Sequence, residues 1–194
     1  GCDLILKSKK NINKNPIILW NHRWEYDKNP DMFFNILFKL KKNEVKFSLI
    51  LLGQSFSNYP ECFSKAKKVL KKEIIHIGYC NSKADYLKLL NKSDVLPVTS
   101  IQDFFGISVV EAVSAGVYPI VPSRLSYPEI LDEDNNPEIF YSDYNQCYDL
   151  LLQYLNDYKV SQKFTSKFEK LVNRFDWGNI IKKYDQKFEK LYEN

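Results

Sequence analysis

The sequence predicts an α/β protein built on a doubly wound parallel sheet. Short apolar runs alternate with amphipathic helical segments from residue 16 to residue 121, which is typical of strands joined by helical crossovers. The 194 residues suit one domain, and a hydrophobic content of 44% is enough for a core. After residue 142 the pattern is helical. We therefore expect one parallel sheet covered by helices, followed by further C-terminal helices.

Five buried strands are expected, because each is a short apolar run bounded by turn residues: 16–20, 47–52, 74–77, 94–98 and 118–121. A helix should begin at Asn29-Pro30-Asp31, which supplies an N-cap, a first-turn proline and a first-turn acid. Its buried face would hold Phe33, Phe34, Leu37 and Leu40.

Further helices are predicted from the apolar spacing. One follows Pro60, one opens with a capping arrangement at residues 82–85, and one follows Gly106. Three more occupy residues 148–155, 164–172 and 177–191. The helix after Pro60 should turn four side chains inward, namely Phe63, Ala66, Val69 and Leu70.

Composition narrows the class of protein only mildly. The net charge is +4 and the three arginines do not cluster, so charge alone does not predict nucleic-acid binding. A lysine-rich helix face leaves RNA binding open, although such faces are usually just solvated: Lys65, Lys67, Lys68, Lys71 and Lys72. No apolar run approaches the ~18 residues that a membrane span needs. We therefore expect no membrane association.

Cysteine and histidine give no metal-ligand pattern. The four cysteines are scattered, which favours free thiols in a reducing cytoplasm: Cys2, Cys62, Cys80 and Cys147. His22 and His76 are the only histidines, too few for a typical zinc site. We therefore expect no metal.

Loops that follow the predicted strands carry polar residues. Ligands of open α/β sheets bind beyond the carboxyl ends of the strands, so these loops should meet at one edge. The loop at residues 21–28 holds Arg23 and Lys28, whose charges suit a diphosphate, although both could be ordinary surface charges. His22 lies on the same loop and is the better site candidate of the two histidines. The loop at residues 76–81 holds Gly78 and Tyr79, which could receive a nucleobase or form a simple turn.

The third loop is the most informative part of the chain. Asp103 and Glu111 stand eight positions apart and bracket Gly106. A glycine lets the backbone approach a ligand closely, and the N–H groups that open the next helix favour an anion. Acids on either side can accept hydrogen bonds from sugar and ribose hydroxyls. Together with Arg23 and Lys28, this pattern predicts a sugar-nucleotide site at the mouth of the sheet.

These residues resemble the C-terminal, donor-binding domain of retaining glycosyltransferases with a GT-B fold. That class carries an acid, seven residues and then Glu around a Phe-Gly pair, which Asp103 and Glu111 match. It also carries Arg, four residues and then Lys, which Arg23 and Lys28 match. The resemblance implies a Rossmann-like domain at residues 16–194, an interdomain linker at residues 1–15, and an absent N-terminal acceptor domain that packs against this one.

A narrower resemblance is to the tRNA-queuosine mannosyltransferase family, carried by residues 20–30, 104–113 and 124–130. It implies a cytoplasmic enzyme that transfers mannose from GDP-mannose to queuosine in tRNA, with retention of configuration and without a metal or other cofactor. Two positions depart from the pattern. Asp103 stands where the class usually has Glu, and Gln102 stands where close relatives often have His.

The resemblance also implies roles for individual residues. Arg23 and Lys28 would neutralise the diphosphate, and Glu111 would accept from the ribose hydroxyls. Asp103 would hold the donor sugar together with the backbone at Phe105, Gly106 and Ile107. His22 and Tyr79 complete the donor-binding candidates. Two other functions remain open: a UDP-sugar-dependent transferase that acts on a glycan or lipid, and a non-catalytic module that binds a nucleotide sugar or RNA.

Overall fold

The computed structural model describes residues 2–4, 13–54 and 60–192 of the chain. Among these residues a six-stranded parallel sheet runs in the order β3-β2-β1-β4-β5-β6. Its strands are β1 (Ile17–Trp20), β2 (Ser48–Leu52), β3 (Ile74–Gly78), β4 (Val95–Pro97), β5 (Tyr118–Pro122) and β6 (Phe140–Tyr141). The predicted doubly wound parallel sheet is confirmed. The two-residue β6 was not predicted, because a strand that short shows no periodicity.

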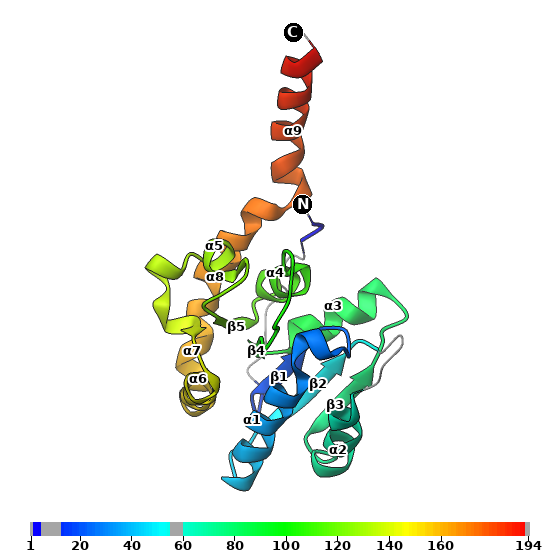
Figure 1. Cartoon of the computed structure of the whole chain (residues 1–194), viewed down its shortest axis with the longest axis vertical. Coiled ribbons are helices and arrows are strands. Elements are labelled where there is room, and N and C mark those ends of the chain that lie inside the picture. The colour runs from blue at the N-terminus through cyan, green and yellow to red at the C-terminus, as the bar shows by residue number, and fades with distance from the viewer. Residues whose placement is uncertain (1, 5–12, 55–59, 193–194) are drawn as a thin grey trace.

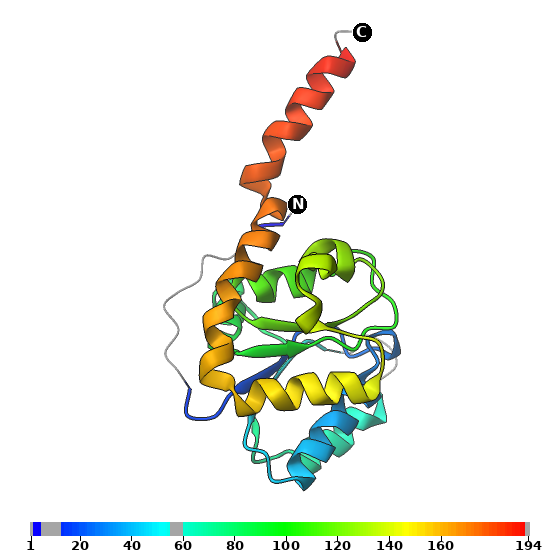
Figure 2. The same cartoon turned by 90° about the vertical axis from the view of Figure 1, so that its left-hand side faces the viewer.

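Helices cover both faces of the sheet (Figures 1 and 2). The helices on one face are α1 (Pro30–Lys42), α2 (Glu61–Val69) and α6 (Tyr144–Asn156). Those on the other face are α3 (Lys83–Lys92), α4 (Ile107–Ser114), α5 (Tyr127–Leu131) and α8 (Thr165–Val172). The side chains of β1 alternate between the two cores, since Ile18 and Trp20 face the first layer while Ile17 and Leu19 face the second. The same short strand therefore contributes side chains to the cores beneath both layers of helices.

Three details of the helices differ from the sequence prediction. The short helices α5 and α7 (Tyr158–Ser161) were not expected. Helix α6 begins at Tyr144 rather than Tyr148, because Asp143 caps it by accepting hydrogen bonds from the N–H groups of Asn145 and Gln146. Val69 is 40% exposed instead of inward, whereas the other three predicted inward residues of that segment are buried.

The last helices leave the body of the protein. After α7 (Tyr158–Ser161) and α8, helix α9 (Trp177–Tyr192) projects away from the sheet, and both views show it standing clear (Figures 1 and 2). Cys2 lies at the root of α9, where it forms a parallel bridge with Asp176 and its N–H donates to the Phe175 carbonyl at 2.9 Å. Most of the predicted linker, residues 1–15, lies outside the described residues. No helix within the described ranges combines the length and the apolar character needed to cross a bilayer.

The strand order reverses between β1 and β4. Such a switch point opens a crevice at the carboxyl ends of the two strands, because their crossovers turn to opposite sides. The loops after β1 and β4 contain the two segments with Arg23, Lys28 and Asp103. The topology therefore brings the predicted site residues to one edge of the sheet.

Candidate functional site

Two hollows adjoin at the carboxyl edge of the sheet and share Asn21, His22 and Arg23 in their walls. The first, of about 540 Å³, is also lined by residues of the loop after β3, of α3 and of α4, including Tyr79, Lys83, Tyr86 and Glu111. The second, of about 650 Å³, is also lined by Asp27, Lys28, Gln102, Asp103, Phe104, Ile107 and Ser108. A two-part ligand could therefore place one end in each hollow, with its centre beside Arg23.

Lys28 is a buried cation in the second hollow. It ends the 3-10 turn η1 (Tyr26–Lys28), and Asn29 follows in a left-handed conformation (φ 50°) that caps α1 by accepting from the Met32 N–H. The Lys28 Nζ donates to the Gln102 carbonyl at 2.7 Å and lies 3.2 Å from an Asp27 carboxylate oxygen. The Lys28 Nζ also lies 3.5 Å from the Oδ2 of Asp103. A buried ammonium held by fixed oxygens is a preorganised positive charge.

Asp103 has a hydrogen bond to each of its carboxylate oxygens. Oδ1 accepts from the Gly106 N–H at 3.0 Å, and Oδ2 accepts from the Tyr127 hydroxyl at 3.0 Å. Gly106 has φ +80°, and a Cβ there would lie 2.9 Å from the Tyr127 ring. A glycine is thus required both by the backbone conformation and by the close approach of Tyr127. Asp103 is consequently rigid, at the point where α4 presents its positive N-terminal end.

Arg23 differs from Lys28 although both are cations of one loop. Its side chain is 59% exposed and pairs loosely with Asp27 at 3.5 Å. It stands at the junction of the two hollows. Arg23 can therefore reorient toward a ligand, whereas Lys28 is already in place.

His22 is a buried imidazole held from several sides. Its Nδ1 lies 2.9 Å from the Ser108 hydroxyl, and its carbonyl accepts from the Trp20 indole N–H at 3.0 Å. Its Nε2 is buried and has no partner among the described residues, and the same holds for Oδ1 of Asn21. Burial lowers the pKa of His22 to about 4, with nearby Lys28 acting in the same direction. The ring is therefore neutral near pH 7 and holds one unused polar atom in the wall shared by both hollows.

Glu111 belongs to a hydrogen-bond network in the first hollow. The Tyr86 hydroxyl donates to its Oε2 at 2.8 Å, and the Asn21 amide donates to the Ser108 carbonyl at 2.7 Å and to the Tyr86 oxygen at 3.4 Å. Burial raises the pKa of Glu111, while the Tyr86 hydrogen bond opposes that rise. The second carboxylate oxygen, Oε1, can accept from a ligand hydroxyl.

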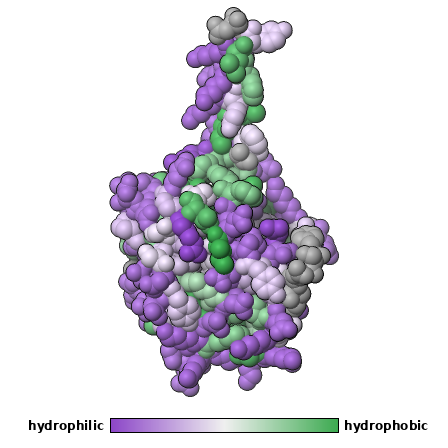
Figure 3. All heavy atoms as spheres, in the orientation of Figure 1, coloured by the Kyte–Doolittle hydropathy of each residue, from purple (hydrophilic) through white to green (hydrophobic). Residues whose placement is uncertain are grey.

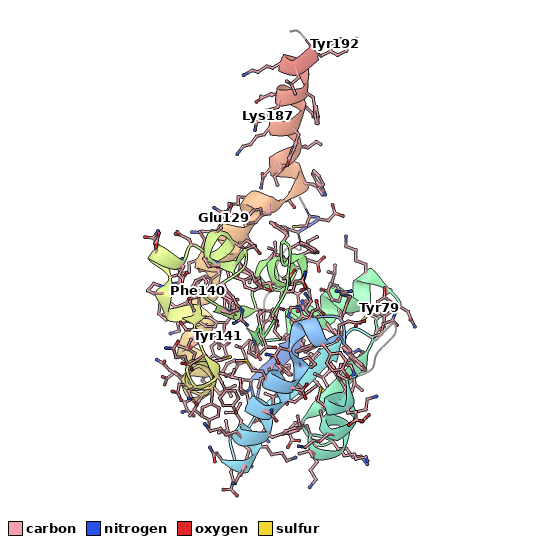
Figure 4. The ribbon with its side chains drawn as sticks, viewed as in Figure 1. Tyr79, Glu129, Phe140, Tyr141, Lys187 and Tyr192 are labelled. Atoms are coloured by element: carbon pink, nitrogen blue, oxygen red, sulfur yellow. The ribbon has the colours of Figure 1, made fainter. Side chains whose placement is uncertain are left out.

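The other predicted donor-binding residues occupy different places. Tyr79 is 63% exposed at the outer rim of the first hollow, near the end of β3 (Figure 4). Ile107 opens α4 and lines the second hollow. Phe105 lines neither hollow, since its ring packs edge-on against Phe175 with centroids 5.1 Å apart. Its carbonyl instead accepts from the Ser126 hydroxyl, which fixes the loop.

Sequence reasoning missed four polar residues of the site: Asn21, Tyr86, Ser108 and Tyr127. Asn21 stands beside the predicted His22, so its position after β1 was a usable signal. The other three bind predicted residues from distant elements. Among the described residues, no group of three or more His, Cys, Asp or Glu side chains is arranged to hold a metal ion.

Comparison with known proteins identifies a family and several relatives of the chain. The family model described as "Glycosyl transferases group 1" matches residues 4–171. The tRNA-queuosine alpha-mannosyltransferase of Drosophila melanogaster is 31% identical over 175 residues, which is 89% of this chain and 45% of that protein. The chain thus spans less than half the length of this curated relative.

Solved structures share the fold. The C-terminal domain of a glycosyl transferase group 1 family protein (LpcC) of Francisella tularensis superposes with a TM-score of 0.74 at 19% identity, covering 91% of this chain and 99% of that one. The pneumococcal O-GlcNAc transferase GtfA, solved with UDP and GlcNAc, gives a TM-score of 0.74 at 14% identity, covering 99% of this chain and 38% of that one. The predicted Rossmann-like α/β fold with C-terminal helices is confirmed, and the structures that share it have the GT-B fold. With the family model matching most of its length, the chain belongs to the glycosyl transferases group 1 family.

Proposed function

We propose that this chain is the donor-binding part of a retaining mannosyltransferase that transfers mannose from GDP-mannose to queuosine in tRNA. The observation that carries the proposal is the 31% identity, over 89% of the chain, with a protein named tRNA-queuosine alpha-mannosyltransferase. Because the chain spans 45% of that protein, the transfer reaction is assigned to the intact protein. The isolated chain is expected to bind the donor and transfer nothing.

The paired hollows support a nucleotide sugar as the ligand. The nucleoside would occupy the first hollow, with its ribose hydroxyls donating to Glu111. The sugar would occupy the second hollow beside Asp103, and the diphosphate would lie between them at Arg23 and Lys28.

The proposed chemistry is charge stabilisation of a leaving diphosphate. When the glycosidic bond breaks, the bonding electron pair leaves with the diphosphate, and the cation of Lys28, the mobile Arg23 and the N-terminal end of α4 would stabilise that charge. These groups supply the positive charge without a metal. Both oxygens of Asp103 are hydrogen-bonded and Glu111 is bonded to Tyr86, so neither carboxylate is placed as a nucleophile. We therefore propose that the acceptor hydroxyl attacks on the face from which the diphosphate departs and that its proton passes to the departing diphosphate oxygen.

A UDP-sugar-dependent transferase is the second candidate, because the superposable pneumococcal enzyme was solved with UDP. Calorimetric titration of the chain with GDP, UDP, GDP-mannose and UDP-glucose separates the two. Selective binding of the guanine nucleotides, lost in Glu111→Ala, would support the mannosyltransferase. Selective binding of UDP would keep the fold and replace the proposed function. Transfer to queuosine-containing tRNA by the intact protein then tests the acceptor, and a protein that binds GDP-mannose but modifies no acceptor would point to a non-catalytic module.

A further inference from the structure

Four exposed apolar side chains lie on the loop after β4, in the first turn of α4 and on the loop after β5. Ile101, Phe104, Ile107 and Leu125 are 58%, 93%, 51% and 40% exposed, and we name them the apolar collar. Phe104 and Ile107 line the hollow directly. Figure 3 shows apolar side chains gathered in front of α4, where the loop leading into that helix lies. Phe104 is thus an almost fully hydrated phenyl ring beside the residues proposed to hold the donor sugar.

The collar is presented by a fixed backbone. On either side of Phe104, both carboxylate oxygens of Asp103 are bonded and the ring of Phe105 packs on Phe175. The N–H groups of Ile101 and Gln102 both donate to the Asp27 carbonyl, at 2.8 and 3.2 Å. The exposure of Phe104 therefore comes from a braced loop, which positions the ring in advance of any ligand.

Leu125 adds a sign of backbone strain. It has φ +61°, a left-handed conformation that is unusual for a leucine and costs free energy. Its neighbours hold it there, since the Arg124 guanidinium donates to the Ser100 carbonyl at 3.0 Å and the Ser126 hydroxyl donates to the Phe105 carbonyl at 3.1 Å. The same contacts tie the Leu125 segment to the Phe104 loop. Backbone strain that fixed contacts hold in place is found most often near functional sites, so this segment is a reasonable place to look for one.

The chemistry of the collar and its surroundings fits a nucleobase. Arg124 is an exposed cation on the loop that carries Leu125, and an aromatic ring beside a cation is a pattern used to bind single-stranded nucleic acid. The acceptor must bring its hydroxyl to the sugar in the second hollow, so its body has to cross the collar. A nucleoside within RNA reaches such a site only when its base is turned out of the stack, and it then needs a new stacking partner.

We infer that Phe104 is the stacking platform for the acceptor nucleoside, with Ile101, Ile107 and Leu125 framing its base and Arg124 facing a flanking phosphate. The inference rests on the proposed function and adds the residue that selects an RNA base as acceptor. It concerns acceptor binding only, and the donor contacts of Asp103 and Glu111 do not depend on it.

The test is steady-state transfer by the intact protein to an RNA stem-loop that carries queuosine, at saturating GDP-mannose. Phe104→Ala should raise KM for the RNA about tenfold or more, as loss of one base–aromatic stack does, and this rise should clearly exceed any change in KM for the donor. Phe104→Trp should keep a low KM, and Phe104→Leu should fall near the alanine variant because it is apolar without a π-face. Phe164→Ala is the matched control, since Phe164 is a 54% exposed phenylalanine outside both hollows.

Each outcome bears on the inference separately from the proposed function. Transfer by the wild-type protein with an unchanged KM in Phe104→Ala overturns the stacking role and leaves the proposed function intact. If Phe104→Ala lowers the melting temperature of the intact protein and leaves KM for the RNA unchanged, the stacking role is overturned. Phe104 would then pack against another part of the polypeptide. Absence of transfer to RNA by the wild-type protein, with transfer to a lipid acceptor, overturns both.

Discussion

Folding lowers the pKa of His22. Its pKa falls from 6.5 to about 4 because the buried ring would carry its charge away from water and near Lys28. Between these two values the unfolded chain binds a proton that the folded chain does not, so the free energy of unfolding falls as the pH falls from 6.5 to 4. The loss from this one group reaches roughly 3 kcal/mol at the acid end.

His22→Gln tests this linkage. Glutamine does not titrate in this range, so the variant should lack that part of the pH dependence while keeping a polar atom near the position of Nε2. The measurement is urea unfolding of both proteins at several pH values from 4 to 7. If the free energy of unfolding depends on pH equally in the two proteins, then folding does not lower the pKa of His22, and the ring takes up its proton in the folded state as it does in the unfolded chain.

Arg23 and Lys28 should respond differently to alanine substitution. Both changes should weaken binding of GDP by roughly 1.5–3 kcal/mol, as expected for charge-assisted hydrogen bonds. Only Lys28→Ala should also lower the free energy of unfolding, by about 3 kcal/mol or more, because it leaves Asp27 and Asp103 beside a buried void without their cation. Calorimetry and urea unfolding of the two variants measure both effects. A stable Lys28→Ala protein would mean that water can replace the ammonium.

At the scale of elements, the loop after β2 depends on a close backbone contact at Gly53. A Cβ there would lie 2.3 Å from the His22 carbonyl oxygen, and φ is +105°. Gly78, which ends β3, has a similar φ of +122° but open space around it. Gly53→Ala should therefore destabilise the protein by clearly more than Gly78→Ala, whose cost is the backbone conformation alone, about 1–3 kcal/mol. Thermal unfolding of the pair isolates the steric contribution, and equal losses would contradict it.

The elements that were predicted well from the sequence are those whose signals lie within a few neighbouring residues. The start of α1 follows from Asn29 and Pro30, and β1 and β2 from uninterrupted apolar runs. Helix α6 was placed four residues late because the cap at Asp143 lies outside the apolar pattern. Strand β6 exists only through its pairing with β5, which no local signal reports.

The candidate site also contains some features with local sequence signals and others that depend on long-range contacts. That Arg23, Lys28 and Asp103 lie together could be predicted, because each follows a strand of a parallel sheet. The contacts that set their properties could not, since Ser108 meets His22 across 86 residues, Tyr86 meets Glu111 across 25 and Tyr127 meets Asp103 across 24. Such pairs depend on how helices pack on the sheet, and a single sequence carries no direct record of that packing.

At the scale of the whole molecule, α9 is almost independent of the core. It contains no buried residue, and the apolar side chains of Trp177, Ile181, Tyr184, Phe188 and Leu191 recur along its exposed surface. Lys187 and Tyr192 extend from its distal half into solvent (Figure 4). Deleting residues 180–194 should therefore leave the melting temperature unchanged and preserve GDP binding by the chain. A large drop in the melting temperature on this deletion would show that the helix folds back onto the body in solution.

The bridge between Cys2 and Asp176 joins residues that stand 174 positions apart in the chain, so two points near opposite ends of the sequence lie side by side. The Cys2 carbonyl accepts from the Trp177 N–H at 3.1 Å, and the Leu4 N–H donates to the Asp176 carboxylate at 3.1 Å. A short peptide could therefore link these two points directly, and the chain could be reopened elsewhere as a circular permutant. Any sequence fused ahead of Cys2 would likewise emerge at the root of α9, so the position of the fusion would be set by the domain rather than by its linker.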